Sequence, residues 1–326
     1  MVSFENAHPW VAERQKQIRF AVQVFPLQDD PNPTESVISA GLLAENVGLD
    51  GFFIGDHPGY HIEPWLHLSN VAARTNRVQL GSVVNCVFHR HPSMIARITA
   101  DLDRISNGRV LLGLGIGWNE AEFGQLGVPF RSVPERQRGL EEALRIIDGM
   151  FDPEPVKFQG EHWQVINALI TSPPVQRPRP PILIAGAGKN TLRQVVRWAD
   201  LSNFGGSKNT GNVQNDDQVL QKLDLIDRLC AEAGRDPGTL LRSHFTSWLM
   251  LADTDHAART KLDGYFPNGL TEEQTRTRIF GSPETVTGYF RSLVQLGFRY
   301  FVVQVQDSRD LETIRLLGEE VAPNVS

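Results

Sequence analysis

Cysteine is scarce in this sequence, and long apolar runs are missing. The two cysteines among the 326 residues, Cys86 and Cys230, lie far apart and have no metal-ligand spacing. This scarcity argues against a disulfide framework and predicts a reducing, cytoplasmic setting. No run approaches the roughly 18 apolar residues that a membrane span needs, and the opening MVSFENAHPWVAERQKQ lacks the apolar core of a signal peptide. We therefore expect no association with a membrane.

Clusters of positive charge are missing as well. The formal net charge is -6 at pH 7, and lysine and arginine form no continuous run. Nucleic acids and anionic membrane surfaces bind basic patches, so neither is an expected partner. The composition leaves an enzyme or a binding protein that acts on a small molecule.

Two glycine-containing stretches look like nucleotide-binding motifs but do not match them. In GLGIGWN (113–119), Trp118 or Glu120 stands where G-x-G-x-x-G needs its third glycine. In GAGKNT (186–191), Asn190 follows Lys189, and Leu183 stands where a P-loop needs its first glycine. Neither a Rossmann site nor a P-loop is predicted.

Strand-like and helical segments alternate along most of the chain. Apolar and β-branched runs predict eight strands, at 18–26, 50–56, 78–87, 109–117, 181–186, 201–206, 243–252 and 299–305. Helical periodicity predicts helices at 33–49, 64–76, 91–106, 134–151, 192–200, 218–234 and within 255–296. This alternation predicts an α/β fold, a (β/α)8 TIM barrel that forms a single domain over 1–326. A doubly wound open sheet is the alternative.

A proline-rich segment at about 152–180 interrupts the alternation between the fourth and fifth strands. The rhythm resumes directly after it, so we interpret it as a surface insertion and not as a domain boundary. It contains a possible hairpin that turns at Gln159-Gly160.

Three glycines occupy alternate positions of the fourth strand. Gly113, Gly115 and Gly117 therefore share one face, while Leu112 and Leu114 share the other. Barrel interiors are normally filled by branched side chains, so an inward glycine face predicts room near the mouth for a large flat molecule. The alternative is that the glycines allow a neighbouring strand or helix to approach closely.

Candidate catalytic residues follow the second and fourth strands, at the barrel end where such folds place their chemistry. Asp56-His57 can supply an anion and a proton donor near neutral pH; a loop cap beside a solvent-facing histidine is the alternative. Trp118 can cover one face of a ring or belong to the core. Asn119 and Glu122 have the spacing of a helix cap.

Two histidines after the third strand raise the question of a metal. His89 and His91 have H-x-H spacing beside Asn85 and Cys86, but no third ligand completes a set. We therefore expect no metal, and a metal-dependent hydrolase on the same barrel is kept as an alternative.

The stretch from Gly186 to Thr191 opens a predicted helix after the fifth strand. Glycines allow backbone N–H groups to converge, and a helix N-terminus favours an anion, so a phosphate seat is predicted. Lys189 would add positive charge. An ordinary turn capped by Asn190 is the alternative.

Taken together, these motifs resemble the bacterial luciferase-like flavin and deazaflavin oxidoreductases. The resemblance is strongest in SNGRVLLGLGIGWNEAEFGQLGVPF (106–130) and the helix after it. FFIGDH (52–57), RTNRVQLGSVVNCVFHRHPSMIA (74–96), PPILIAGAGKNTLRQVVRWADLSNF (180–204) and GSPETVTGYFRSLVQLGFRYFVVQV (281–305) support it. It covers nearly the whole chain except the first residues and the insertion.

The resemblance implies a cofactor ring at the carboxyl end of the barrel, beside a non-proline cis peptide around Ser82–Asn85. It implies coenzyme F420 more than FMN, a proton-donor role for His57 with Asp56, and a homodimer. The residues expected to bind the cofactor are Asp56, Ser82, Val83, Asn85, Gly117, Trp118, Asn119, Gly186, Ala187, Gly188, Lys189, Asn190 and Thr191.

One position departs from the family pattern. Some relatives carry a carboxylate directly after the last glycine of the fourth strand, where this chain has Trp118. Sugar-phosphate chemistry is therefore in doubt, and Glu120 or Glu122 replaces that carboxylate only if the geometry allows. The predicted function is an F420-dependent hydride transfer or an FMN-dependent monooxygenation of a small organic substrate. A non-catalytic cofactor-binding protein is the alternative.

Overall fold

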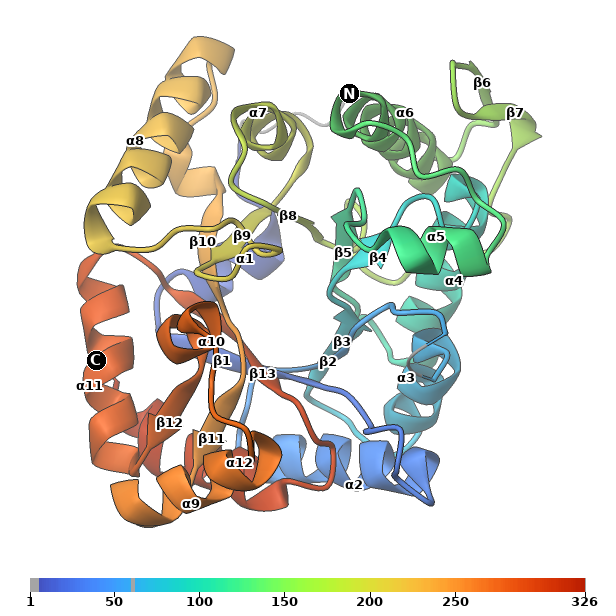
Figure 1. Ribbon diagram of the computed structural model, residues 1–326. Helices are drawn as coiled ribbons and strands as arrows, with labels where there is room; N and C mark the ends of the chain where they lie inside the picture. The colour runs from blue at the N-terminus through green and yellow to red at the C-terminus, as the bar shows by residue number, and fades with distance from the viewer. Residues whose placement is uncertain (1–5, 60–61, 326) are drawn as a thin grey trace.

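The computed structural model describes residues 6–59 and 62–325. Its centre is a ring of parallel strands surrounded by helices (Figure 1). In order around the ring these strands are β3 (Gln79–Ser82), β2 (Gly51–Ile54), β1 (Arg19–Val24), β13 (Tyr300–Val305), β10 (Leu241–Thr246), β9 (Leu201–Gly205), β8 (Ile182–Ala185), β5 (Leu112–Gly115) and β4 (Asn85–Cys86).

The ring closes where the third and fourth barrel strands meet. Leu80 N donates a hydrogen bond to Arg109 O at 2.7 Å, and Leu111 N donates to Leu80 O at 2.9 Å. Because β3 and β4 are two parts of one segment, the ring contains eight strand segments. The predicted (β/α)8 barrel is confirmed, and the open-sheet alternative is wrong.

The third segment is interrupted at Val83 and Val84, whose peptide bond is cis. Asn85 fixes the segment from behind: its Nδ2 donates to Gly113 O at 2.9 Å, and its Oδ1 accepts from Trp65 Nε1 at 3.1 Å. The non-proline cis peptide implied by the resemblance is confirmed.

Strand side chains alternate between the barrel interior and the layer beneath the helices. In β1, Ala21 lies in the interior cluster, whereas Val22 and Val24 pack against the helices. Helix α1 (Pro9–Arg14) closes the barrel end opposite the mouth, with the Trp10 ring 5.5 Å from that of Tyr300. This packing leaves the carboxyl ends of the strands as the open end.

Helices cover the outside of the barrel (Figure 1). Several begin with proline, which suits a first turn because its missing N–H has no partner within the helix there. The longer helices are α2 (Pro33–Asn46), α3 (Pro64–Ala72), α4 (Pro92–Ile105), α6 (Val133–Phe151), α7 (Lys189–Trp198), α8 (Asp216–Ala233), α9 (Asp255–Tyr265) and α11 (Pro283–Gln295). The shorter ones are α5 (Glu120–Gln125), α10 (Glu272–Thr277) and α12 (Leu311–Leu316). Among the described residues, no helix has the length and apolar character to cross a membrane.

The predicted insertion forms a hairpin that projects at the periphery of the barrel (Figure 1). Its strands, β6 (Val156–Gln159) and β7 (Gln164–Ala168), are antiparallel. Glu142 of α6 accepts hydrogen bonds from the backbone N–H groups of residues 161–163, and Asp103 of α4 accepts from those of Val175 and Gln176. These two helix carboxylates therefore anchor the insertion to the barrel.

The predicted strand at 243–252 is wrong at its end. β10 stops at Thr246, and β11 (Leu249–Leu251) pairs with β12 (Ile279–Gly281) in a separate parallel sheet. Trp248 lies between them with a φ of 50°, a left-handed conformation that redirects the chain. The segment 255–296, predicted as helical, consequently contains a strand.

Candidate active site

A cavity of about 1450 Å³ opens at the carboxyl ends of the barrel strands. It is lined by residues that follow β1, β2, β5, β8, β9, β10 and β13, among them Phe25, His57, Trp118, Gly188 and Gln306. A pocket for one small molecule usually measures about 300–1,000 Å³. This cavity therefore has room for a cofactor and a substrate together.

The glycine face of β5 points into the barrel, as predicted. Leu111 belongs to the interior cluster and Leu114 to the outer one, so Gly113 and Gly115 face inward between them. Gly115 and Gly117 line the cavity, and Gly117, two residues beyond the end of β5, has a φ of 72°. The glycine pattern does mark the cavity wall.

Much of the space at the glycines is nevertheless filled by the third barrel strand. A Cβ on Gly113 would lie 2.6 Å from Ser82 O and 3.1 Å from Val83 Cα, and one on Gly115 would lie 2.9 Å from Val84 Cγ2. Close approach of a neighbouring strand is therefore the correct reading of Gly113. The glycines create room indirectly, because they let Val83 and Val84 lie flat against β5 and form the wall.

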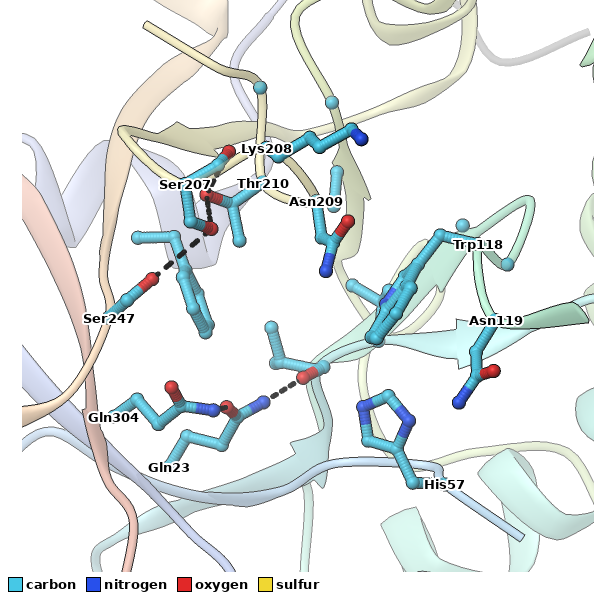
Figure 2. A pocket seen from close by; sticks show the side chains of 18 of the residues that line it. Gln23, His57, Trp118, Asn119, Ser207, Lys208, Asn209, Thr210, Ser247 and Gln304 are labelled. Carbon is cyan, nitrogen blue, oxygen red and sulfur yellow. Dashed lines mark hydrogen bonds between the residues drawn. The ribbon is translucent and has the colours of Figure 1, made fainter. Parts of the chain in front are cut away.

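His57 lies in the cavity wall and contacts a buried carboxylate. Its Nδ1 lies 2.7 Å from Glu122 Oε1, and Asn119 Nδ2 donates to the same oxygen at 3.0 Å. The Glu122 side chain is 4% exposed, whereas that of His57 is 27% exposed. Figure 2 shows His57 next to Trp118, and their ring centres are 6.0 Å apart. An imidazole thus lies at the cavity surface with a buried carboxylate behind it.

The predicted helix cap at this place is only half correct. Asn119 caps α5, since its Oδ1 accepts from Ala121 N at 3.1 Å. Glu122 does not complete a capping box but turns inward to His57. Glu122 lies in α5 and His57 lies in the loop after β2, so no local spacing rule connects them, and sequence reasoning missed their contact.

Asp56 is buried beside His57 and also lines the cavity. Arg90 Nη1 donates to Asp56 Oδ2 at 2.7 Å, and Arg90 also pairs with Glu63. Burial alone would raise the pKa of Asp56, but the nearby His89 and the positive charge of Arg90 outweigh it and hold that pKa below its ordinary value. Asp56 is therefore a fixed anion at neutral pH.

Two inward glutamines join the barrel strands near the cis peptide. Gln23 Nε2 donates to Val83 O, and Gln304 Nε2 donates to Gln23 Oε1 at 3.3 Å (Figure 2). Both glutamines line the cavity. Sequence reasoning missed them, although a lone amide within an apolar strand is a signal for an inward polar contact.

The stretch from Gly186 to Thr191 joins β8 to α7. Gly186 has a φ of 127°, and Gly188 occupies the cap position of α7, where no side chain bonds to the first-turn N–H groups. A Cβ on Gly188 would meet only Thr191 Oγ1, at 3.7 Å. Open space before an uncapped helix N-terminus suits an anion such as a phosphate.

The wall opposite His57 carries hydroxyl groups from the loops after β9 and β10. Ser207 Oγ and Thr210 Oγ1 are 2.7 Å apart, and Ser247 Oγ donates to Ser207 Oγ at 3.4 Å (Figure 2). All three line the cavity. They give this wall a polar surface that contrasts with the apolar wall at Val83 and Val84.

Arg278 adds a positive charge to the hydroxyl-bearing wall. Its guanidinium carbon lies 4.4 Å from the centre of the Trp248 ring, and its buried Nε has no hydrogen-bond partner among the described residues. Burial lowers the pKa of Arg278 to about 10, and Glu273 opposes this shift, so the group is charged at neutral pH. Glu273 itself accepts from Lys208 N at 2.9 Å.

Most of the predicted site residues line the cavity. They are Asp56, His57, Val83, Gly117, Trp118, Asn119, Gly186, Ala187, Gly188 and Thr191. Ser82 and Asn85 are fully buried and do not line it. Lys189 and Asn190 are exposed, and Asn190 Nδ2 donates to Gln137 Oε1 at 3.2 Å. These four were predicted as cofactor contacts, but the structure places them behind or beside the cavity.

The two histidines of the metal alternative have separate contacts. His89 is buried with its Nδ1 3.6 Å from Asp56 Oδ2, whereas His91 caps α4 and accepts from Ser93 N at 3.2 Å. Within residues 6–59 and 62–325, no group of three or more His, Cys, Asp or Glu side chains could hold a metal ion.

The geometry can be compared with known proteins. Residues 18–285 match the model of the luciferase-like monooxygenase family. The chain belongs to this family. It is 30% identical to the F420-dependent glucose-6-phosphate dehydrogenase of Microbacterium testaceum, over 94% of this chain and 97% of that protein.

Solved structures share the fold. The coenzyme F420-dependent tetrahydromethanopterin reductase of Methanopyrus kandleri has a TM-score of 0.79 at 20% identity, over 95% of this chain and all of that one. The oxygenating constituent of 3,6-diketocamphane monooxygenase from Pseudomonas putida, in complex with FMN, has a TM-score of 0.76 at 20% identity. The match covers 95% of this chain and 99% of that one. At this identity the likeness shows the barrel fold alone.

Proposed function

We propose that the protein is an F420-dependent oxidoreductase that transfers a hydride between the deazaflavin and a small organic substrate. The observation that carries the proposal is the His57 imidazole, paired with Glu122 at the mouth of a cavity large enough for two ligands. The 30% identical relative named as an F420-dependent dehydrogenase supports the choice of cofactor.

The described residues fit such a cofactor. Val83, Val84 and Gly115 form a flat apolar wall for a ring, and the uncapped start of α7 at Gly188 suits a phosphate. Thr191 lines the same end of the cavity and can donate its hydroxyl hydrogen. When bound, F420 supplies the two-electron hydride chemistry.

The protein's own side chains provide the proton, the orientation and the exclusion of water. His57 exchanges a proton with the substrate through the ring nitrogen that does not face Glu122. Asp56, held by Arg90, is a fixed acceptor in the cavity wall and can accept a hydrogen bond from a bound cofactor. Trp118 is 51% exposed and lies beside His57, where a bound substrate would cover it and water would be displaced.

The polar wall is the proposed substrate side. Ser207, Thr210 and Ser247 offer hydroxyl groups. The Arg278 guanidinium offers a positive charge, and its Nε has no hydrogen-bond partner among the described residues. This chemistry suits an oxygen-rich or anionic substrate such as a hydroxylated ketone or an acid. A flat apolar part of the same molecule would contact Trp118.

An FMN-dependent monooxygenase is the second candidate, because a solved structure with the same barrel contains FMN. The experiment is an anaerobic titration of the purified protein with F420 and, separately, with FMN, followed by absorbance. The loaded protein is then mixed with a panel of carbonyl compounds and alcohols.

Tight binding of F420, with a substrate-dependent change in its absorbance, is the expected result. Exclusive binding of FMN would favour the monooxygenase. Binding without any turnover would favour a non-catalytic cofactor-binding protein.

We also propose that the protein acts in the cytoplasm and forms a homodimer. Its two cysteines are both free and buried, which suits a reducing compartment. The dimer rests on the family resemblance alone. Size-exclusion chromatography with light scattering tests it, and a monomeric mass would contradict it.

A further inference from the structure

We propose that Glu122 is a positioning residue that fixes the orientation and the tautomer of His57. Glu122 lies in the first turn of α5, two residues after Glu120, which is exposed. The Glu122 side chain is instead turned inward and is 4% exposed. A carboxylate is seldom buried without a bonded partner, and the partner here is His57.

The hydrogen-bond network determines which atom carries the hydrogen. Asn119 Oδ1 accepts from Ala121 N at 3.1 Å, so its amide is oriented with Nδ2 toward Glu122 Oε1, 3.0 Å away. His57 Nδ1 lies 2.7 Å from the same oxygen. An ionised carboxylate can only accept. The hydrogen between Nδ1 and Oε1 therefore belongs to His57, and Nε2 is the atom that gains and loses a proton.

The surroundings of the ring support this role. The Trp118 ring centre is 6.0 Å away on one side and the Phe25 ring centre is 5.7 Å away on another, so both restrict how the imidazole can turn. Asp56 is engaged by Arg90, and Arg136 donates to the backbone carbonyl of Gly117. Glu122 is the carboxylate that the structure pairs with His57.

The catalytic consequence rests on the proposed function. A histidine whose Nδ1 is held by a carboxylate presents Nε2 to the substrate in a single tautomer. If Glu122 merely anchored α5, its replacement would change stability and leave the His57 tautomer as it is. The two readings therefore differ in a spectroscopic observable.

The experiment uses the full chain without cofactor, labelled with ¹⁵N-histidine. Two-bond ¹H–¹⁵N spectra report which ring nitrogen is protonated, and a His57→Gln sample assigns the His57 signals. We expect an Nδ1–H tautomer in the wild type and in Glu122→Gln, whose amide oxygen still accepts. In Glu122→Leu the acceptor is lost, and the population shifts to Nε2–H. Glu120→Gln, on the exposed side of α5, is the matched control and should match the wild type.

An unchanged His57 tautomer in Glu122→Leu would overturn the proposal. Glu122→Asp is the second variant if the leucine protein does not fold: its shorter side chain keeps the charge but cannot reach Nδ1, so the same tautomer shift is expected.

Kinetics with bound F420 provide an independent readout. Glu122→Leu should lower kcat roughly tenfold or more, part of the 10²–10⁴-fold that a general acid or base contributes, while the Kd for F420 stays unchanged. A tautomer shift in a protein that turns over no substrate would refute the proposed function and leave the positioning role supported. Normal kcat in a folded Glu122→Leu protein would refute the positioning role.

Discussion

Replacing Gly113 by alanine tests how the glycine strand supports the cavity. The added Cβ would lie 2.6 Å from Ser82 O and 3.1 Å from Val83 Cα. Both neighbours are backbone atoms of the third barrel strand, so no rotamer change can relieve the contact. That strand must shift, and its shift moves the wall formed by Val83 and Val84 into the cavity.

The expected magnitudes follow from this contact. Forcing an extra methyl into a packed interior costs about 1–3 kcal/mol. A wall displaced toward the ring should also weaken cofactor binding by about tenfold, which corresponds to roughly 1.4 kcal/mol. Gly115→Ala should cost less, because its nearest neighbour is a side-chain atom, Val84 Cγ2 at 2.9 Å.

Urea unfolding and a fluorescence titration with F420 measure the two effects. Gly288→Ala is the matched control, since Gly288 lies inside α11 with no atom within 4 Å of the added Cβ. It should stabilise the protein by about 0.5–1 kcal/mol through helix propensity. The reasoning is refuted if Gly113→Ala is as stable as the wild type and binds F420 equally well.

Four other predictions concern the site and the pH dependence of stability. Gly188→Asp should weaken cofactor binding by at least tenfold through charge repulsion at the start of α7, whereas Gly188→Ala should change it little, since its Cβ meets only Thr191 Oγ1 at 3.7 Å and carries no group that caps the helix; equal Kd values for the two variants would place the phosphate elsewhere. His57→Ala should leave the Kd for F420 within a few-fold and slow turnover by roughly 10²-fold, and a normal kcat would remove His57 from the mechanism. Arg278→Met replaces the guanidinium on Trp248 by an uncharged, flexible side chain and so removes the charge; we expect KM for an anionic substrate to rise while kcat changes little, and an unchanged KM would argue against a substrate contact. Burial lowers the pKa of His244 from 6.5 to about 3, so below pH 6.5 the unfolded chain takes up a proton that the folded protein refuses, and stability falls by about 2 kcal/mol at pH 5. His244→Gln should lose correspondingly less stability between pH 7 and pH 5 in urea unfolding, and an equal loss would contradict the assignment.

The fold could be predicted well because its signals are local. Buried parallel strands are short apolar runs, and helices between them repeat every three to four residues, so each unit could be recognised from its own residues. The errors arose where one residue changes the chain direction. Trp248, in a left-handed conformation, splits the run 243–252 between two sheets, and no residue pattern marks such a tryptophan.

The site could be predicted only in part, because its contacts join distant loops. Asp56, His57, Gly186, Ala187 and Gly188 could be placed by their position after a strand, and all of them line the cavity. The pairing of His57 with Glu122 and the position of Arg278 on Trp248 depend on how loops meet above the barrel. These contacts are determined by tertiary packing, and no periodic pattern in the sequence indicates them.

The central claim is that this barrel mouth holds a deazaflavin beside His57 for hydride transfer. Its most direct test is a stopped-flow measurement in which protein loaded with reduced F420 is mixed with candidate carbonyl substrates under anaerobic conditions. We expect substrate-dependent reappearance of oxidised F420 in the wild type, slowed roughly 10²-fold in His57→Ala. Failure of the wild-type protein to bind F420 at all, or reoxidation at the same rate in both proteins, would contradict it.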